Sequence, residues 1–470
     1  MKSNNLNIFF KSSIIYALGT IGCKFVSFLL LPLNTSHLNP LEYGTADLII
    51  VIVSLILPIS TLEIGTGMYK YLLSSNEKNK IVTNGILILI LGTSIVSFLS
   101  IIIGMLLDFE FAFLLMCLIF FGSFRISLLP ISRGLGYSKN YAISGIVSTI
   151  ITVITNVVLI KFTPLRVEAI LISSILADLI LSLYLIYSTK LFLYISIDYM
   201  DLNCINSLLK FSIPIIPNSF SWWIDNSLAK IILNKSHGGI QNGYLAVVQK
   251  FPNLFNTLFS VLSLAWNDVT IKDQDNDDKQ IFQSKFMSEM LVLLMEILTI
   301  IIIAIKISFP FLVDKQYTYS FYFIPVFIIA VSLSCYSDLF SSSFLSSGET
   351  KYISLTSLSS SFVGLIFAIN LIPLFGILGA GLSLLIAKAL LMVIRFILIK
   401  KKYYLVSINS KHLIVFIILL VITGYYYYQC NILIDIAICI IIIFIFIFMN
   451  LKILKRLYFI FMKGKKHESI

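Results

Sequence analysis

The stretch "SSIIYALGTIGCKFVSFLLLPL" (residues 12–33) sets the class of this protein. As a helix it is long enough to cross the roughly 30 Å of hydrocarbon in a bilayer. It exceeds the apolar core of a signal peptide, contains Lys24, and is not followed by a small-residue cleavage motif. We therefore predict a membrane-spanning helix here and no cleaved leader.

Similar apolar runs recur along the whole chain. Of the 470 residues, 58% are hydrophobic and only 12% are charged, with a mean hydropathy of +0.98, whereas soluble domains have roughly 25% charged residues. Weak alternation of polar and apolar residues argues against a β-barrel. We predict an all-α membrane protein with fourteen spans, near 12–33, 46–72, 82–107, 111–132, 141–162, 168–189, 208–233, 243–266, 288–313, 317–340, 352–373, 377–399, 412–430 and 432–450.

The basic residues are distributed unevenly between the two sides of these spans. Of 34 Lys and Arg residues, 24 fall on the side of the N-terminus and five on the opposite side. Arg395 is counted with the 24. By the positive-inside rule both termini are cytoplasmic. The net charge of +11 forms no single patch, so nucleic acid is not an expected partner, whereas membrane lipids are.

Signatures of enzymes and metal sites are missing from the sequence. The six cysteines show no CxxC spacing, and no HExxH, GxSxG or P-loop pattern appears. "DQDNDD" (273–278) lacks the Gly and Glu of a calcium loop. No loop exceeds about 20 residues, which leaves no room for a soluble catalytic domain. We expect no catalytic residue, no cofactor, no metal and no enzymatic activity.

An internal repeat is visible at a spacing of about 200 residues. "NTSHLNPLEYGTA" (34–46) matches "NKSHGGIQNGYLA" (234–246), and "GYSK" (136–139) matches "GETK" (348–351). Each copy holds six spans, so the copies share one orientation and an axis along the membrane normal relates them. The expected division is two parallel six-helix lobes around a central cavity, 1–200 and 201–402, followed by a helix pair and basic tail, 403–470.

Ten ionisable residues are candidates for charges at membrane depth. The cations are Lys24, Arg125, Lys230, Lys250 and Lys388, and the anions are Glu63, Asp178, Asp225, Glu296 and Asp338. Each such charge costs at least about 2.5 kcal/mol at the bilayer centre, so it usually faces a wet cavity or a partner. Structural pairing or snorkelling is favoured for the residues near span ends, Lys250, Glu296 and Asp338. A functional role is favoured for the mid-span residues, Lys24, Glu63, Arg125, Asp178, Lys230 and Lys388.

The stretch "SFSWWIDNSLAKIILN" (219–234) carries two of these charges. Asp225 and Lys230 are five residues apart and lie about 140° apart around a helix, so each is expected to find its partner elsewhere. For Trp222 and Trp223 in the same stretch, core packing is favoured over stacking on sugar rings.

Helix breakers accompany the charges. Pro58, with Gly65 and Gly67, is expected to interrupt the second span, and Pro214 with Pro217 the seventh. Such interruptions are tolerated where the backbone lines a cavity, and simple kinking explains them equally well.

Cations that converge on one cavity would suit an anionic substrate group such as a diphosphate. The candidates for substrate binding are Lys24, Arg125, Lys230, Lys250 and Lys388. The candidates for charge pairing, or for coupling to H⁺ or Na⁺, are Glu63, Asp178 and Asp225, because burial raises a carboxyl pKa toward the working range.

A family resemblance rests on five motifs in order: "SHLNPLEYGTADL" (36–48), "FSIPIIPNSFSWWIDNSLAKIIL" (211–233), "GYLAVVQKFPNLF" (243–255), "LAW" (264–266) and "IPLFGILGAGLSLLIAK" (372–388). The chain resembles bacterial oligosaccharide flippases of the polysaccharide transport family, within the multidrug/oligosaccharidyl-lipid/polysaccharide exporter superfamily. The resemblance implies two lobes that move an undecaprenyl-diphosphate-linked oligosaccharide across the cytoplasmic membrane by ion-coupled alternating access. It singles out Lys230, which stands where similar proteins commonly have Arg.

Further expectations follow from this resemblance. The product would serve surface polysaccharide such as O-antigen or capsule, and other polysaccharide assembly proteins would be partners. One alternative is a cation-coupled multidrug exporter of the same superfamily, although five intramembrane cations argue against cationic substrates. Another is a membrane-embedded polysaccharide polymerase or acyltransferase, for which a large outer loop or a membrane-depth His would be expected.

Overall fold

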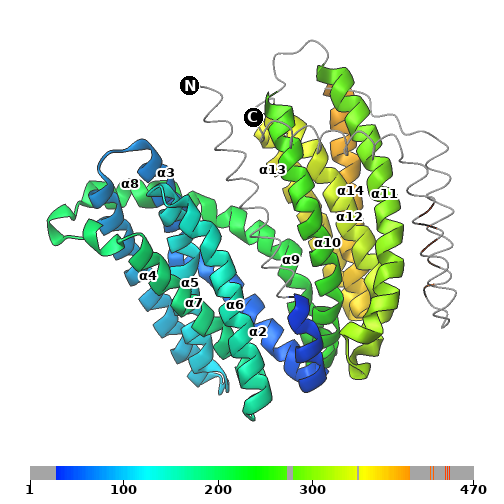
Figure 1. Cartoon of the computed structure of the whole chain (residues 1–470), viewed down its shortest axis with the longest axis horizontal. Helices are drawn as coiled ribbons and strands as arrows, with labels where there is room; N and C mark the ends of the chain where they lie inside the picture. The colour runs from blue at the N-terminus through cyan, green and yellow to red at the C-terminus, as the bar shows by residue number, and fades with distance from the viewer. Residues whose placement is uncertain are drawn as a thin grey trace, which may run out of the picture. The chain divides into compact units, whose positions relative to one another are not determined.

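The computed structural model describes residues 28–272, 279–346 and 349–402 and a few single residues beyond. These described segments form helices and short connections without any strand (Figure 1). After a helix that ends at His37, the elements are α2 (Pro40–Thr61), α3 (Ile64–Ser74), α4 (Lys78–Leu106), α5 (Ala112–Gly134), α6 (Ser138–Phe162), α7 (Val167–Ser188), η1 (Leu191–Tyr194), η2 (Ile197–Tyr199), α8 (Leu202–Ser212), η3 (Ile213–Ile215), α9 (Ile216–His237), α10 (Gly239–Lys272), α11 (Lys279–Leu312), η4 (Lys315–Phe323), α12 (Ile324–Ser346), α13 (Thr350–Phe375) and α14 (Ile377–Lys402).

Eight described helical segments are long and apolar enough to cross a membrane. They correspond to the predicted spans 2 to 6 and 10 to 12, so the prediction of a multi-pass helical membrane protein is confirmed. The predicted spans 7, 8 and 9 correspond to α9, α10 and α11, which are not among the eight. Spans 13 and 14, and most of span 1, lie outside the described residues.

The chain divides into two compact units. Unit 1 comprises Met1–Lys250 and Gly364–Ala380, and unit 2 comprises Phe251–Val363 and Gly381–Ile470. The boundary crosses α10 just after Lys250, so the first turns of α10 belong with α2 and α9. The division at 200 and 402 that the repeat suggests stays a prediction.

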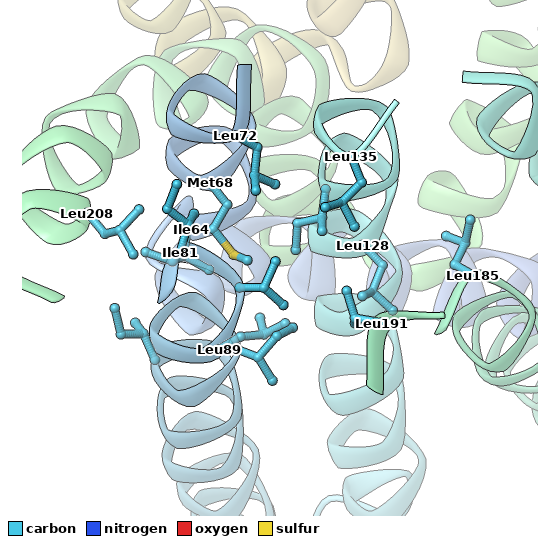
Figure 2. Close-up of a cluster of buried hydrophobic side chains, with 14 of the residues drawn as sticks. Ile64, Met68, Leu72, Ile81, Leu89, Leu128, Leu135, Leu185, Leu191 and Leu208 are labelled. Atoms are coloured by element: carbon cyan, nitrogen blue, oxygen red, sulfur yellow. The ribbon is translucent and has the colours of Figure 1, made fainter. Parts of the chain in front are cut away.

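The core of unit 1 joins five helices and a connecting turn. Its buried side chains come from α3, α4, α5, α7, η1 and α8, and Figure 2 shows those of Ile64, Met68 and Leu72 gathered with Leu89 and Leu128. Met68 is completely buried, as its adaptable thioether suits a meeting point of several helices. This cluster anchors α3 and therefore positions Glu63 at its N-terminal end.

The predicted interruption of the second span is confirmed, and it lies between Pro58 and Gly65. Pro58 remains inside α2, and the helix ends at Thr61. Leu62 and Glu63 adopt left-handed backbone conformations, with φ of 50° and 53°, and α3 begins at Ile64. Non-glycine residues rarely adopt this conformation, so the break is held by its surroundings rather than by local preference.

The prolines of the seventh predicted span do mark a break. The span was expected to begin at 208, which lies in α8; a 3₁₀ turn at Ile213–Ile215 separates this helix from α9. Pro214 lies within the turn and Pro217 in the first turn of α9, where a missing N–H costs no helical hydrogen bond. The chain therefore passes from α8 to α9 through a short 3₁₀ turn.

The segment before α8 is tied to the start of α4. The Asn84 side chain donates to the Tyr199 carbonyl at 2.9 Å and accepts from the Asp201 N–H at 3.0 Å. Thr83 donates to the Tyr194 carbonyl at 3.0 Å, and the Lys80 ammonium lies 2.6 Å from the Asp201 carboxylate. This pairing lowers the pKa of Asp201, because the Lys80 ammonium donates to its carboxylate.

Candidate functional site

A buried ion pair joins α2 to α9. Lys230 Nζ lies 2.7 Å from Asp47 Oδ2, and the side chains are only 9% and 16% exposed. Burying two charges is costly unless the charged groups lie close together in good geometry. The short distance between Lys230 and Asp47 meets that condition. The sequence-based expectation that Lys230 finds its partner in another helix is therefore correct.

A second lysine belongs to the same group. Lys250, on α10, interacts electrostatically with Tyr43 and Asp47 of α2. Tyr43 and Asp47 are four residues apart on α2, so they share one face of the helix. We call Tyr43, Asp47, Lys230 and Lys250 the lysine cluster, and all four belong to unit 1.

Further polar contacts hold α9 beside α2. Trp223 is buried and donates from Nε1 to the Val51 carbonyl at 3.1 Å. Ser219 donates to Glu63 Oε1 at 2.6 Å. Core packing was the favoured role for Trp223, and its burial agrees with that role. The indole N–H also has a backbone acceptor, the Val51 carbonyl. These contacts fix the level at which Lys230 meets α2.

Glu63 lies in the break between α2 and α3. One carboxylate oxygen accepts from Ser219, and the other accepts from Thr66 Oγ1 at 3.3 Å. The backbone carbonyl of the same residue accepts from the N–H groups of Thr66 and Gly67. The break thus gathers a carboxylate and two hydroxyls at one point of unit 1, an arrangement of oxygen ligands that suits a hard cation.

Arg125 and Asp178 pair with each other between α5 and α7. Arg125 Nε lies 2.6 Å from Asp178 Oδ1. An added methyl carbon at Gly122 would lie 3.5 Å from Asp178 Oδ2, so this glycine leaves room for the carboxylate. Among the described side chains, this pair lies outside the lysine cluster and forms a separate charged site in the same unit.

Unit 2 has a charged network of its own, centred on Arg395 of α14. This side chain is 2% exposed, and its guanidinium donates to Thr356, Ser337, Asp338 and Ser357 at 2.9 to 3.3 Å. Arg395 was counted with the basic residues on the side of the N-terminus, and that side stays a prediction. Its burial shows that the side chain packs inside unit 2.

Other predicted residues of unit 2 lie around this network. Lys388, on α14, interacts electrostatically with Asp338, whose side chain is 50% exposed. Glu296, on α11, is buried and interacts with Tyr336 of α12. The structural role favoured for Asp338 agrees with its contact to Arg395.

The structure brings together two of the five predicted substrate-binding residues, Lys230 and Lys250. Arg125 lies at a separate site, and Lys388 belongs to unit 2. Lys24 and the side chain of Asp225 lie outside the described part of the chain. The role of Asp225 in charge pairing or ion coupling stays a prediction, and Asp47 is the partner that the structure shows for Lys230.

Sequence reasoning did not select Asp47 or Tyr43. Asp47 stands directly inside the expected start of the second span, at 46, where a charge is usually taken as a span boundary. The available signal was spacing, because Tyr43, Asp47 and Val51 recur every four residues and therefore line one face of α2. All three contact residues of α9 or α10.

The two loops paired by the sequence match have the same local geometry. Ser36 hydrogen-bonds to Nδ1 of His37 at 2.9 Å, and Ser236 to Nδ1 of His237 at 2.9 Å. The helices that follow these loops also touch. The Asn242 side chain donates to the Gly44 carbonyl at 3.0 Å, and an added methyl carbon at Gly44 would lie 2.5 Å from the Gly243 nitrogen.

No family model matches the sequence, and no curated protein matches it. Solved structures do. A structure of the lipid II flippase MurJ in an inward closed conformation aligns with a TM-score of 0.72 and 15% identity, over 95% of this chain and 100% of that chain. An inward-facing multidrug resistance transporter of the MATE family of the MOP superfamily aligns with a TM-score of 0.64 and 13% identity, over 83% and 98% of the two chains.

A MOP superfamily transporter from Pyrococcus furiosus, described by the reverse polarity of its binding pocket, aligns with a TM-score of 0.56 and 15% identity, over 83% and 95%. The chain thus has the fold of the multidrug/oligosaccharidyl-lipid/polysaccharide exporter superfamily, and the resemblance read from the sequence is confirmed at the level of the fold. The solved structures that share it are transporters and not enzymes.

Proposed function

We propose that this protein flips an undecaprenyl-diphosphate-linked oligosaccharide from the inner to the outer leaflet of a bacterial cytoplasmic membrane. Transport proceeds by alternating access of the lobes 1–200 and 201–402, with both termini in the cytoplasm, and supplies surface polysaccharide biosynthesis. Other polysaccharide assembly proteins would deliver and receive the lipid. The fold shared with a lipid II flippase supports this choice.

The observation that carries the proposal is the composition of the lysine cluster. Its described side chains comprise two ammonium groups, of Lys230 and Lys250, and one carboxylate, of Asp47. Such a group favours an anion, because attraction between unit charges strengthens as the surroundings become less polar. Lysine serves as a compact point charge for phosphate groups, so a diphosphate fits the cluster.

The other predicted residues have assigned roles in the same proposal. Lys24, Arg125 and Lys388 would bind anionic groups of the substrate at other stages of its passage. Glu63, Asp178 and Asp225 would bind H⁺ or Na⁺ as the coupling ion. Glu63 is the favoured member of this set, because Ser219 and Thr66 place hydroxyl groups beside its carboxylate at a helix break.

A cation-coupled multidrug exporter is the second candidate, since MATE transporters share the fold. The lysine cluster argues against a cationic drug at that position, because two ammonium groups would repel it. A deletion strain discriminates between the two functions. Increased drug susceptibility with normal surface polysaccharide would support the exporter.

The decisive experiment measures lipid-linked oligosaccharide in each leaflet of a strain that lacks the protein. We expect complete oligosaccharide to accumulate on the cytoplasmic side, with loss of surface polymer. Accumulation on the outer side would instead indicate a polymerase or transferase.

The deletion strain also permits a test of the lysines. Lys230→Gln and Lys250→Gln are expected to lower transport at least about tenfold, because each removes a charged contact to phosphate. Lys235→Gln is the matched control, since Lys235 is an exposed lysine of the same helix α9. Full transport by both cluster variants at normal membrane levels would refute their role.

A further inference from the structure

Asp47 is shared between two lysines, and this sharing has a consequence for substrate binding. Its carboxylate contacts Lys230 directly at 2.7 Å and interacts with Lys250 over a longer range. If Lys230 turned to another anion, Asp47 would remain beside Lys250. Lys250 therefore partly compensates the charge of the carboxylate when Lys230 is lost as its partner.

The helices packed around α2 carry other charged side chains besides those of the lysine cluster. α2 packs against α4, α5, α7 and α9. The charged pairs on these neighbours are satisfied elsewhere: Arg125 of α5 pairs with Asp178 of α7, and Lys80 of α4 pairs with Asp201. Among the described side chains, the partners recorded for Asp47 are Lys230, Lys250 and Tyr43.

We propose that Asp47 is an internal counter-ion that the diphosphate of the substrate displaces from Lys230. In the empty protein the Asp47 carboxylate is paired with the Lys230 ammonium, so the ion pair between α2 and α9 is formed. When a diphosphate enters, Lys230 binds the phosphate and Asp47 is left with Lys250. The inference rests on the proposed function and adds a residue that sets the affinity and anion selectivity of the site.

Displacement follows from the charges involved. A diphosphate carries more negative charge than one carboxylate, and a neutral or cationic molecule gives Lys230 no alternative to Asp47. Breaking the ion pair weakens one link between α2 and α9, while Trp223 still donates to α2 and Ser219 still donates to Glu63 in the break after α2. A ligand shifts such an equilibrium only by its differential affinity for the two arrangements. Competition at Lys230 supplies that difference.

The test measures binding of farnesyl diphosphate to the full-length protein in detergent micelles by calorimetry, with farnesol as the uncharged comparison. Asp47→Asn keeps the shape of the side chain and removes the competing charge. We expect it to raise the affinity for farnesyl diphosphate at least about fivefold, the lower end of typical coupling between two ligands of one site. Farnesol affinity should not change.

Asp201→Asn is the matched control. It breaks another Asp–Lys pair of unit 1, of 2.6 Å, outside the lysine cluster, and should leave diphosphate affinity at the wild-type value. The double variant Asp47→Asn with Lys230→Gln should lose the gain, because the cation that Asp47 releases is absent. Thermal unfolding of each variant shows that the protein used for binding is folded; if Asp47→Asn does not fold, Asp47→Ser takes its place.

The outcomes separate the two proposals. If the wild type and every variant fail to bind farnesyl diphosphate, the proposed function fails, and the counter-ion role fails with it. If the wild type binds and Asp47→Asn binds equally or more weakly, the counter-ion role is refuted while the function stands. An equal gain in Asp201→Asn would also overturn the inference, because the effect would then be general to lost ion pairs.

Discussion

Gly243 allows α10 to approach α2 more closely than any other residue would. A methyl carbon at this position would overlap the Pro40 carbonyl oxygen, which is backbone and cannot rotate away. We expect Gly243→Ala to destabilise the protein by about 1 to 3 kcal/mol, the usual effect of overpacking. The melting temperature in detergent should fall accordingly.

Gly122→Ala serves as the comparison for Gly243. Its added carbon would meet side-chain atoms of Leu57 and Asp178 at 3.3 and 3.5 Å, and side chains adjust by a few tenths of an ångström. A smaller change in melting temperature is expected. Equal stability of Gly243→Ala and the wild type would contradict the close approach of α2 and α10.

Arg395 is the most heavily bonded charged residue that the structure describes. Arg395→Met removes every donor of the guanidinium while keeping an apolar side chain. We expect the free energy of unfolding to fall by about 1 to 3 kcal/mol, because buried oxygens of Ser337 and Thr356 lose their donor. Arg395→Lys should be intermediate, because a single ammonium cannot reproduce the planar fork. Thermal unfolding of the Arg395→Met and Arg395→Lys variants measures these losses of stability.

An exposed lysine of α14 provides the control for Arg395. Lys400→Met should change stability by no more than about 0.5 kcal/mol, as surface substitutions usually do. If Arg395→Met were as stable as this control, its network would contribute nothing to unit 2.

At the scale of elements, residues 194–201, which precede α8, are held in part by the titratable ion pair between Lys80 and Asp201. Asp201→Asn is expected to increase backbone hydrogen exchange in residues 194–201 at pH 7, because the ion pair to Lys80 is lost. Exchange within α5 should not change. Unaltered protection of residues 194–201 would show that Asn84 and Thr83 hold this segment without the ion pair.

The pH dependence of that contact has a definite sign. The pKa of Asp201 is lowered in the folded protein by Lys80. Its contribution is therefore fully present above the ordinary Asp pKa of about 3.9 and is lost as the pH falls through the lower folded-state value. The segment should loosen in acid only, and Asp201→Asn should remove that response.

The helical elements were predictable to different degrees, for physical reasons. Hydropathy and length identify most spans because a bilayer demands about 20 apolar residues. The turn before α9 was marked by Pro214 and Pro217. An interruption of the second span was marked by Pro58, Gly65 and Gly67. Its exact position at Leu62 and Glu63 carries no local signal, because positive φ angles usually favour glycine and neither residue is one.

The candidate site was predictable only in part for a similar reason. Lys230 and Lys250 stood out as cations at membrane depth, but their shared counter-ion did not. Asp47 is nearly 200 residues from both lysines in sequence, and a contact at that separation depends on how helices pack. The burial of Arg395 was not predicted, because basic residues at the end of a span are usually assigned to the surface.

At the scale of the whole molecule, the remaining prediction concerns the sidedness of the two matched loops. Ser36 and Ser236 are exposed and occupy equivalent places beside His37 and His237. Because the helices that follow them touch at Gly44 and Asn242, the two loops lie at the same end of unit 1. A parallel duplication requires this arrangement, whereas an inverted repeat would place matched loops on opposite sides.

Cysteine labelling measures the sidedness directly. In a cysteine-free background, Ser36→Cys and Ser236→Cys should both react with a membrane-impermeant maleimide added to intact cells. Glu77→Cys and Asn206→Cys, exposed near the Lys80–Asp201 pair, should react only after the membrane is opened. Labelling of one loop cysteine without the other would contradict the parallel arrangement. Labelling of the second pair alone would keep that arrangement and reverse the proposed orientation, placing the termini outside.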